Sequence, residues 1–183
     1  MASLNAQVGP KPLQLLHEFV PAAFAIARLV NPTNSKNAEQ TTKDVQRAAA
    51  SRGLKLYVIG AATENDLHEA FAKLLALKAA GLVIANETFF ANRSEQLAAL
   101  SVHYAVPAAH QSREFAVAGG LLSYGGDTRE SHGQAGVYTG RVLKGEKPAD
   151  LPIQQITKVE FAAKALGLTI PSGMLARADE VIE

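Results

Sequence analysis

The stretch from Leu82 to His110, LVIANETFFANRSEQLAALSVHYAVPAAH, places a helical pattern between two short apolar runs. The runs at 82–86 and 106–110 each have the length of a buried strand. Residues 91–105 between them have the spacing of an amphipathic helix. Because two buried strands joined by a crossover helix pair in parallel, this stretch predicts one unit of a parallel α/β sheet.

The same alternation continues on both sides of this stretch. Five strands alternating with helices predict an α/β domain with a doubly wound, mainly parallel five-stranded sheet and the flavodoxin-like strand order 2-1-3-4-5. We assign residues 1–145 to this α/β lobe and residues 146–183 to a C-terminal return segment that packs on the lobe. The expected strands are 25–30, 54–59, 82–86, 106–110 and 119–125, and the expected helices are 13–20, 37–52, 64–80, 91–105 and 134–145.

Local signals mark several of these boundaries. Gly53 follows the second predicted helix in the position that favours a left-handed cap. Thr63 and Asp66 stand three residues apart at the next helix start, which predicts a weak form of the capping box. Toward the C-terminus the patterns weaken, with a proline-containing connection at 146–158 and a short helix and tail at 162–183.

Composition limits the classes of function. Hydrophobic residues make up 48% of the 183 residues, which is enough for a folded core. A net charge of +1 without a basic run argues against nucleic acid as a partner. The absence of Cys excludes disulfides, thiolate catalysis and Cys-ligated zinc. No segment has about 18 consecutive apolar residues, and the N-terminus lacks a signal-peptide pattern, so we expect a cytoplasmic location if the chain is complete.

Several common site motifs are missing. The sequence has no G-x-x-x-x-G-K-[ST], no strand followed by G-x-G-x-x-G and no G-x-S-x-G elbow. The histidines are scattered without metal-ligand spacing, so we expect no metal and no cofactor. A phospho-acceptor domain needs carboxylates after its first strand, where this chain has the neutral NPTN at 31–34. A triad of Ser123, His110 and Asp127 stays open, because only geometry can decide it.

Polar and aromatic residues follow four of the predicted strands, at the edge where parallel sheets bind ligands. Neutral amides and hydroxyls dominate, Arg113 can hold a carboxylate, and Phe89 and Phe90 can form an apolar wall. This mixture suits non-covalent binding of a small polar molecule with an apolar part. Structural roles remain the alternative for these residues. Phe89 and Phe90 can pack in the core, and Pro32 and Asn34 can form a turn and a helix cap. The segments are NPTN at 31–34, NETFF at 86–90, HQSREF at 110–115 and SYGGD at 123–127.

Three stretches, at 15–34, 82–127 and 140–183, together resemble the ABC-transporter substrate-binding protein family of the tryptophan/tyrosine type. The most specific parts are REFAVAGGLLSYG at 113–125 and LKGEKPADLPIQQITKVE at 143–160, which KALGLTIP follows. The resemblance implies two α/β lobes of the type I periplasmic-binding-protein fold with a ligand cleft between them. It also implies an extracytoplasmic, usually periplasmic, location and delivery of the ligand to an ABC permease. Aromatic amino acids are the ligands for which the family is named.

The chain resembles the second lobe of such a protein together with its return segment. In the family pattern a signal sequence and a first lobe precede the equivalent of Leu4. The pattern also has more residues between ITK at 156–158 and KALGL, so we expect the apolar strand there to be shortened or lost. The helix at 133–145 resembles one that packs partly on the first lobe. Its apolar surface is therefore expected to be exposed, or buried by another chain in a homodimer.

Carried over residue by residue, the family's cleft gives ligand-binding candidates and no catalytic residue. Glu114 is the candidate for a ligand's ammonium group, although a structural Arg113–Glu114 pair stays open. We therefore expect the solute-binding component of an ABC importer, without enzymatic activity, that captures a small molecule such as an amino acid. The alternative is a one-lobe interaction or regulatory protein that dimerises and has no transport role. The candidates are Asn31, Thr33, Asn34, Asn86, Thr88, Phe89, Gln111, Ser112, Arg113, Glu114, Ser123 and Tyr124.

Overall fold

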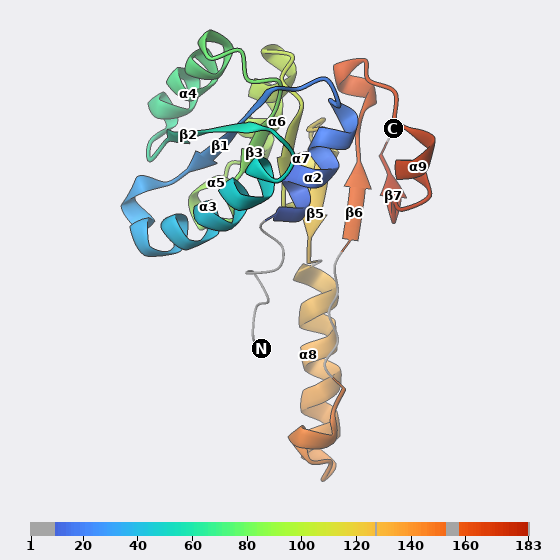
Figure 1. Ribbon diagram of the computed structural model, residues 1–183. Coiled ribbons are helices and arrows are strands. Elements are labelled where there is room, and N and C mark those ends of the chain that lie inside the picture. Colours follow the sequence, from blue (N-terminus) through green and yellow to red (C-terminus); the bar gives the residue numbers. More distant parts are fainter. Residues whose placement is uncertain (1–9, 127, 153–157, 183) are drawn as a thin grey trace.

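The computed structural model describes residues 10–126, 128–152 and 158–182 (Figure 1). Within them, one sheet contains β1 (Ala25–Val30), β2 (Lys55–Gly60), β3 (Leu82–Ile84), β4 (Ala108–His110), β5 (Leu122–Gly125), β6 (Lys158–Phe161) and β7 (Glu180–Val181). Their order across the sheet is β2-β1-β3-β4-β5-β6-β7. The first five strands are parallel, which confirms the predicted order 2-1-3-4-5. β6 is antiparallel to β5, and β7 is parallel to β6.

Helices lie on both faces of this sheet (Figure 1). They are α2 (Pro10–Phe19), α3 (Ser35–Ala50), α4 (Glu64–Ala76), α5 (Thr88–Ala91), α6 (Ser94–His103), α7 (Arg113–Val117), α8 (Thr128–Leu143) and α9 (Ser172–Leu175), with 3₁₀ turns η1 (Pro32–Asn34), η2 (Pro148–Asp150) and η3 (Lys164–Leu166). Phe71, Phe90 and Phe115 are fully buried in the core under α4, α5, α6 and α7. Leu16 and Phe161 are fully buried in a second core, which α2, α3 and the C-terminal elements share.

The C-terminal part of the sheet differs from the expectation. The strand that was expected to be shortened or lost is present as the four-residue β6, and two further residues of the expected tail form β7. Val159 and Phe161 pack against the second core, whereas Lys158 and Glu160 face a cavity on the other side of the sheet. In the sequence, apolar and charged residues alternate over only four positions, 158–161, and two of these residues are charged. This pattern is too short to predict a strand.

Helix boundaries also differ in places. The helix predicted over 91–105 is present as the shorter α6, and the separate short helix α5 precedes it. The hydroxyl of Ser94 donates to the carbonyl of Ala91 (2.7 Å) where α6 begins. The short α7 was not predicted, because five residues are too few to show a helical period. The capping box at the start of α4 is confirmed: the Thr63 hydroxyl accepts from the Asp66 N–H, and the Asp66 carboxylate accepts from the Thr63 N–H. Gly53 has the expected left-handed conformation, with φ +69°.

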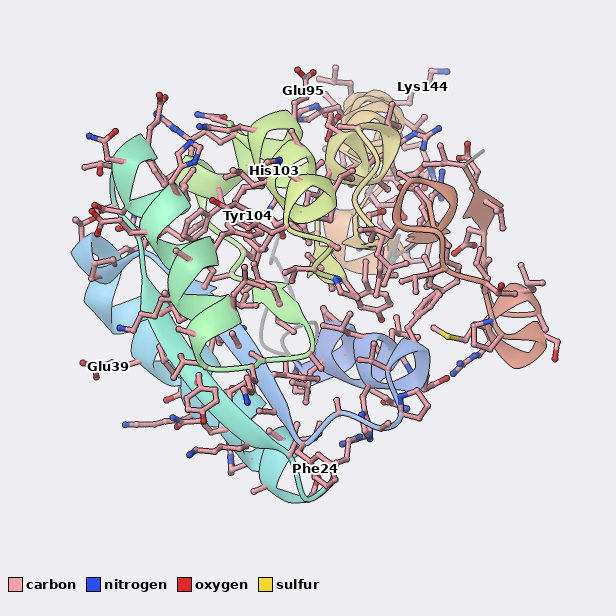
Figure 2. All side chains as sticks on the ribbon, turned by 90° about the horizontal axis from the view of Figure 1, so that it is seen from above. Phe24, Glu39, Glu95, His103, Tyr104 and Lys144 are labelled. Atoms are coloured by element: carbon pink, nitrogen blue, oxygen red, sulfur yellow. The ribbon has the colours of Figure 1, made fainter. Side chains whose placement is uncertain are left out.

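Aromatic contacts join α6 to α4. The ring of Tyr104, just after α6, stacks on Phe71 of α4 with 5.5 Å between the ring centroids. His103 lies edge-on to the same tyrosine at 4.8 Å, and the two side chains are neighbours in the view from above (Figure 2). Phe24, before β1, instead lies at the periphery and is 87% exposed (Figure 2). The α6 layer is therefore held to α4 by stacked rings as well as by aliphatic packing.

Helix α8 extends away from the sheet, beyond the end at which β5 stops (Figure 1). Residues 148–152 fold back along it, and the Tyr138 hydroxyl donates to the Pro152 carbonyl at 2.6 Å. Val137 and Leu143 remain 54% and 82% exposed. The predicted exposure of apolar groups on this helix is thus observed. Within the described residues, no helix combines the length and the apolar content needed to cross a membrane.

Candidate functional site

The carboxyl ends of β1, β3, β4 and β5 lie along one edge of the sheet, because these strands are parallel. Around Glu87, at the β1 and β3 ends, polar side chains form a compact cluster. The Glu87 carboxylate accepts hydrogen bonds from the side-chain amides of Asn31 (3.2 Å) and Asn34 (2.5 Å). The side-chain oxygen of Asn31 accepts from the N–H (3.0 Å) and the hydroxyl (2.7 Å) of Thr33. Asn31 and Asn34 therefore meet at one carboxylate, and Thr33 joins the cluster through its two hydrogen bonds to Asn31.

A cavity of about 680 Å³ lies along the same edge, at the ends of β4 and β5. The side-chain amide of Gln111 donates to the side-chain oxygen of Asn86, so the cavity lies next to the end of β3. Gly125 allows the backbone to approach closely here, because a Cβ atom on it would lie 2.3 Å from the Gln111 carbonyl oxygen. The predicted residues that line the cavity are Gln111, Ser112, Arg113, Glu114 and Ser123.

Glu160 of β6 is a buried carboxylate in the wall of this cavity. Ser123, on the neighbouring strand, donates from its hydroxyl to Glu160 Oε2 at 2.6 Å. Arg113 donates from Nη1 to Glu160 Oε1 at 3.3 Å and from Nη2 to Glu180 of β7 at 2.9 Å. Arg113 therefore links the start of α7 to both C-terminal strands. Beside it, the Ser112 hydroxyl donates to the Glu114 carboxylate at 2.5 Å.

His110, the last residue of β4, is only 1% exposed and lies edge-on to Phe115 with 5.6 Å between ring centroids. Its Nδ1 accepts a long hydrogen bond from the Ser112 N–H (3.4 Å), and its buried Nε2 has no partner among the described residues. Burial lowers the pKa of His110 to about 4, and the nearby Glu114 carboxylate acts in the opposite direction. His110 is therefore a neutral imidazole at neutral pH. Of the Ser123, His110 and Asp127 set, Ser123 donates its hydroxyl to Glu160, and Asp127 lies outside the described residues.

Besides Asn31, Thr33 and Asn34 in the Glu87 cluster and Asn86 beside Gln111, three further candidates lie outside the wall of the cavity. Alternation along β5 directs Ser123 to the cavity and Tyr124 to the opposite face, where it packs against the second core. Burial there raises the pKa of the Tyr124 hydroxyl. Thr88 is exposed at the start of α5. Phe89 lies under the Arg93 guanidinium, which is 4.2 Å from its ring centroid, so its role as a packing residue accounts for its position.

Sequence reasoning missed four charged residues of this edge, Glu87, Glu95, Lys158 and Glu160. Glu87 lies inside the NETFF segment at 86–90, so it could have been predicted together with its neighbours Asn86 and Thr88. Lys158 and Glu160 are two positions apart, so a strand at 158–161 places both on the face that the cavity occupies. No group of three His, Asp or Glu side chains suited to a metal ion comes together in the part of the chain that the structure describes.

A mostly parallel sheet with helices on both faces, and with a polar cavity at its carboxyl edge, defines a ligand-binding α/β lobe. The family model described as ABC transporter substrate binding protein matches residues 4–182. The chain therefore belongs to this family. No curated protein matches the sequence.

Solved structures share the fold. A conserved domain protein from Vibrio cholerae has a TM-score of 0.76 and 24% identity, with 94% of this chain and 60% of that chain covered. An ABC domain from Streptococcus pneumoniae, in complex with L-Trp, has a TM-score of 0.76 and 21% identity, with 96% and 60% covered. A ligand-free substrate-binding protein from Clostridium difficile has a TM-score of 0.68 and 22% identity, with 94% and 59% covered. The chain thus spans about three fifths of the length of these structures and has the fold of one lobe of a periplasmic binding protein.

Proposed function

We propose that this chain provides one wall of the ligand cleft in the solute-binding component of an ABC importer, and that the ligand is an amino acid or a zwitterion of similar size. The observation that carries the proposal is the cavity at the carboxyl edge, which carboxylates and cations line together. The complex of a similar fold with L-Trp supports amino acids as the first class to test.

Charges of both signs in one small cavity fit a ligand that carries both signs itself. Lys158 and Arg113 supply cations for a ligand carboxylate, and the wall also contains three carboxylates, Glu95, Glu114 and Glu160, one of which can bind an ammonium group. Val117 adds apolar surface for a ligand side chain. The five charged residues in this wall, which carry both signs, therefore favour a zwitterion as the ligand.

In this proposal the cavity by itself binds the ligand weakly, and a second wall opposite the cavity tightens the binding. The similar structures are longer than this chain, and α8 extends past the carboxyl edge toward the space that a second wall must occupy (Figure 1). Closure of the two walls around a ligand removes water and strengthens each charged contact. The polar cluster of Asn31, Thr33, Asn34 and Glu87 then borders the ligand on the β1 side. Release to a membrane permease and an extracytoplasmic location belong to the same proposal.

Calorimetric titration of the 183-residue protein with the L-amino acids, and with glucose as a non-zwitterionic control, tests the proposal. We expect at least one amino acid to bind and glucose not to bind. Lys158→Gln should weaken that binding about tenfold, because a charged hydrogen bond to the ligand carboxylate is lost. Lys144→Gln is the matched control, since Lys144 follows α8 and lies at the periphery (Figure 2). If glucose binds and no amino acid binds, the proposal that the ligand is a zwitterion is wrong.

A dimerising interaction protein without a transport role is the second candidate, and the exposed side of α8 favours it. Gly136 leaves open space next to the exposed Val137, since a Cβ atom on it meets nothing within 4 Å. Another helix can approach closely at such a surface. Light scattering decides this candidate: a dimer that Gly136→Leu dissociates supports it, and a monomer at about 100 μM rejects it.

A further inference from the structure

Glu160 differs from the other carboxylates of the cavity in its depth. Its side chain is 5% exposed, whereas Glu95 and Glu114 are exposed residues. An ionised carboxylate at this depth has lost most of its hydration, so donors from the protein or from a ligand must replace the water. The groups that contact Glu160 therefore decide what it can bind.

Two donors contact Glu160 among the described residues, and they compensate its charge incompletely. The Ser123 hydroxyl is close, at 2.6 Å, but carries no charge. The Arg113 guanidinium is 3.3 Å away and is shared with Glu180, to which it donates at 2.9 Å. One cation thus serves two carboxylates. Since a carboxylate can accept about four hydrogen bonds, Glu160 keeps capacity for a further donor.

The charges around the cavity point the same way. Among the described residues, its wall contains the carboxylates of Glu95, Glu114 and Glu160 and the cations of Arg113 and Lys158, and these five groups have one negative charge in excess. An ammonium group in the cavity balances that excess, and its three N–H donors match a wall built from carboxylate oxygens.

We infer that Glu160 is the residue that recognises a primary ammonium group of the ligand, and that Ser123 and Arg113 position its carboxylate for this contact. The inference deepens the proposed function and rests on it. It gives Glu160 the role that the sequence analysis gave to Glu114. Water surrounds the exposed Glu114 carboxylate, which also accepts from Ser112, so its attraction for an ammonium group is screened. The buried Glu160 is screened far less.

Three related probes separate the two charges of an amino acid. L-Tryptophan carries both, tryptamine carries only the ammonium group, and indole-3-propionate carries only the carboxylate. Titrated into the wild-type protein by calorimetry, tryptamine should bind at least about tenfold more tightly than indole-3-propionate, because the buried charge selects the cation. If the amino-acid titrations select a different ligand, its decarboxylated and deaminated analogues replace these probes.

Glu160→Gln removes the charge and keeps the shape of the side chain. We expect it to weaken binding of L-tryptophan and tryptamine about tenfold or more, and to leave indole-3-propionate unchanged within about twofold. Glu180→Gln is the matched control, because Glu180 also pairs with Arg113 but does not line the cavity. It should leave all three affinities unchanged. The thermal midpoint of each variant shows whether it folds. If Glu160→Gln does not fold, the affinities of the wild-type protein for tryptamine and indole-3-propionate still test the role of Glu160.

The outcomes distinguish this inference from the proposed function. Equal binding of tryptamine and indole-3-propionate, beside binding of L-tryptophan, overturns the role of Glu160 and keeps the amino-acid ligand. Equal losses in the Glu160→Gln and Glu180→Gln variants also overturn it, because they indicate a role through Arg113 alone. Binding of the amine without the amino acid supports Glu160 and rejects the amino-acid ligand. Binding of neither the amine nor the amino acid rejects both.

Discussion

Replacing His110 with asparagine should make the stability of the protein less sensitive to acid. Burial lowers the pKa of His110 from 6.5 to about 4 in the folded protein. As the pH falls through this window, the unfolded chain binds a proton that the folded chain does not. Folding stability from this group is therefore complete above pH 6.5 and is lost progressively toward pH 4.

The size of the effect follows from the two pKa values. The gap between 6.5 and about 4 corresponds to about 3 kcal/mol of unfolding free energy, at about 1.4 kcal/mol for each pKa unit. Between about pH 7.5 and pH 5, the unfolding free energy that His110 contributes falls by about 2 kcal/mol. Asparagine cannot titrate in this range, and its side-chain oxygen can still accept from the Ser112 N–H.

Urea denaturation of the wild type and of His110→Asn at these two pH values measures the effect. The wild type should be the more stable protein at pH 7.5, because the variant loses packing beside Phe115. That advantage should shrink by about 2 kcal/mol at pH 5. His103→Asn is the matched control, since His103 is exposed on α6, and its difference from wild type should stay constant. If the difference in unfolding free energy between the wild type and His110→Asn is the same at both pH values, the predicted contribution of His110 is refuted.

Four further substitutions test the fold by urea denaturation. Thr63→Ala should cost about 1 kcal/mol, because the capping hydroxyl of α4 is lost, and no loss would contradict the capping box. Gly125→Ala should destabilise the protein by more than about 1 kcal/mol, since the new Cβ meets the carbonyl of Gln111 at 2.3 Å, whereas Gly133→Ala, with open space around it, should stabilise α8 by up to about 1 kcal/mol. Arg28→Lys should cost about 1 kcal/mol, because a single ammonium cannot replace both bonds of the buried guanidinium to α3.

The parallel part of the sheet could be predicted because each strand is a mainly apolar run beside a helical pattern. The local sequence alone predicts that Leu82, Val83 and Ile84 are buried, and the structure confirms it. β6 could not be predicted in this way, because it depends on pairing with β5, 37 residues away from Ser123 to Glu160. The end of β3 was placed two residues too late, and the starts of β4 and β5 were placed two and three residues too early.

The candidate site was predictable at the level of the sheet edge and less so at the level of single residues. The order of strands places Asn31, Gln111 and Ser123 at one edge, and the structure finds them there. The two-residue period of a strand already excludes Ser123 and Tyr124 from sharing one face, a rule that the residue list did not apply. Glu160 could not be found without β6. Ligand binding by any of these residues stays a prediction.

The way β6 is held has a consequence for engineering. Its backbone bonds to β5, and Phe161 is buried in the second core, so residues 158–182 do not depend on the outlying helix for their position. A helix of 16 residues is about 24 Å long, and this one carries the whole connection from β5 to the return segment at a distance from the core. Cleavage after Lys144 or Lys147 should therefore leave two fragments that stay associated and co-elute. The same place then serves for separating the chain into two co-expressed halves, or for new chain ends in a permuted protein.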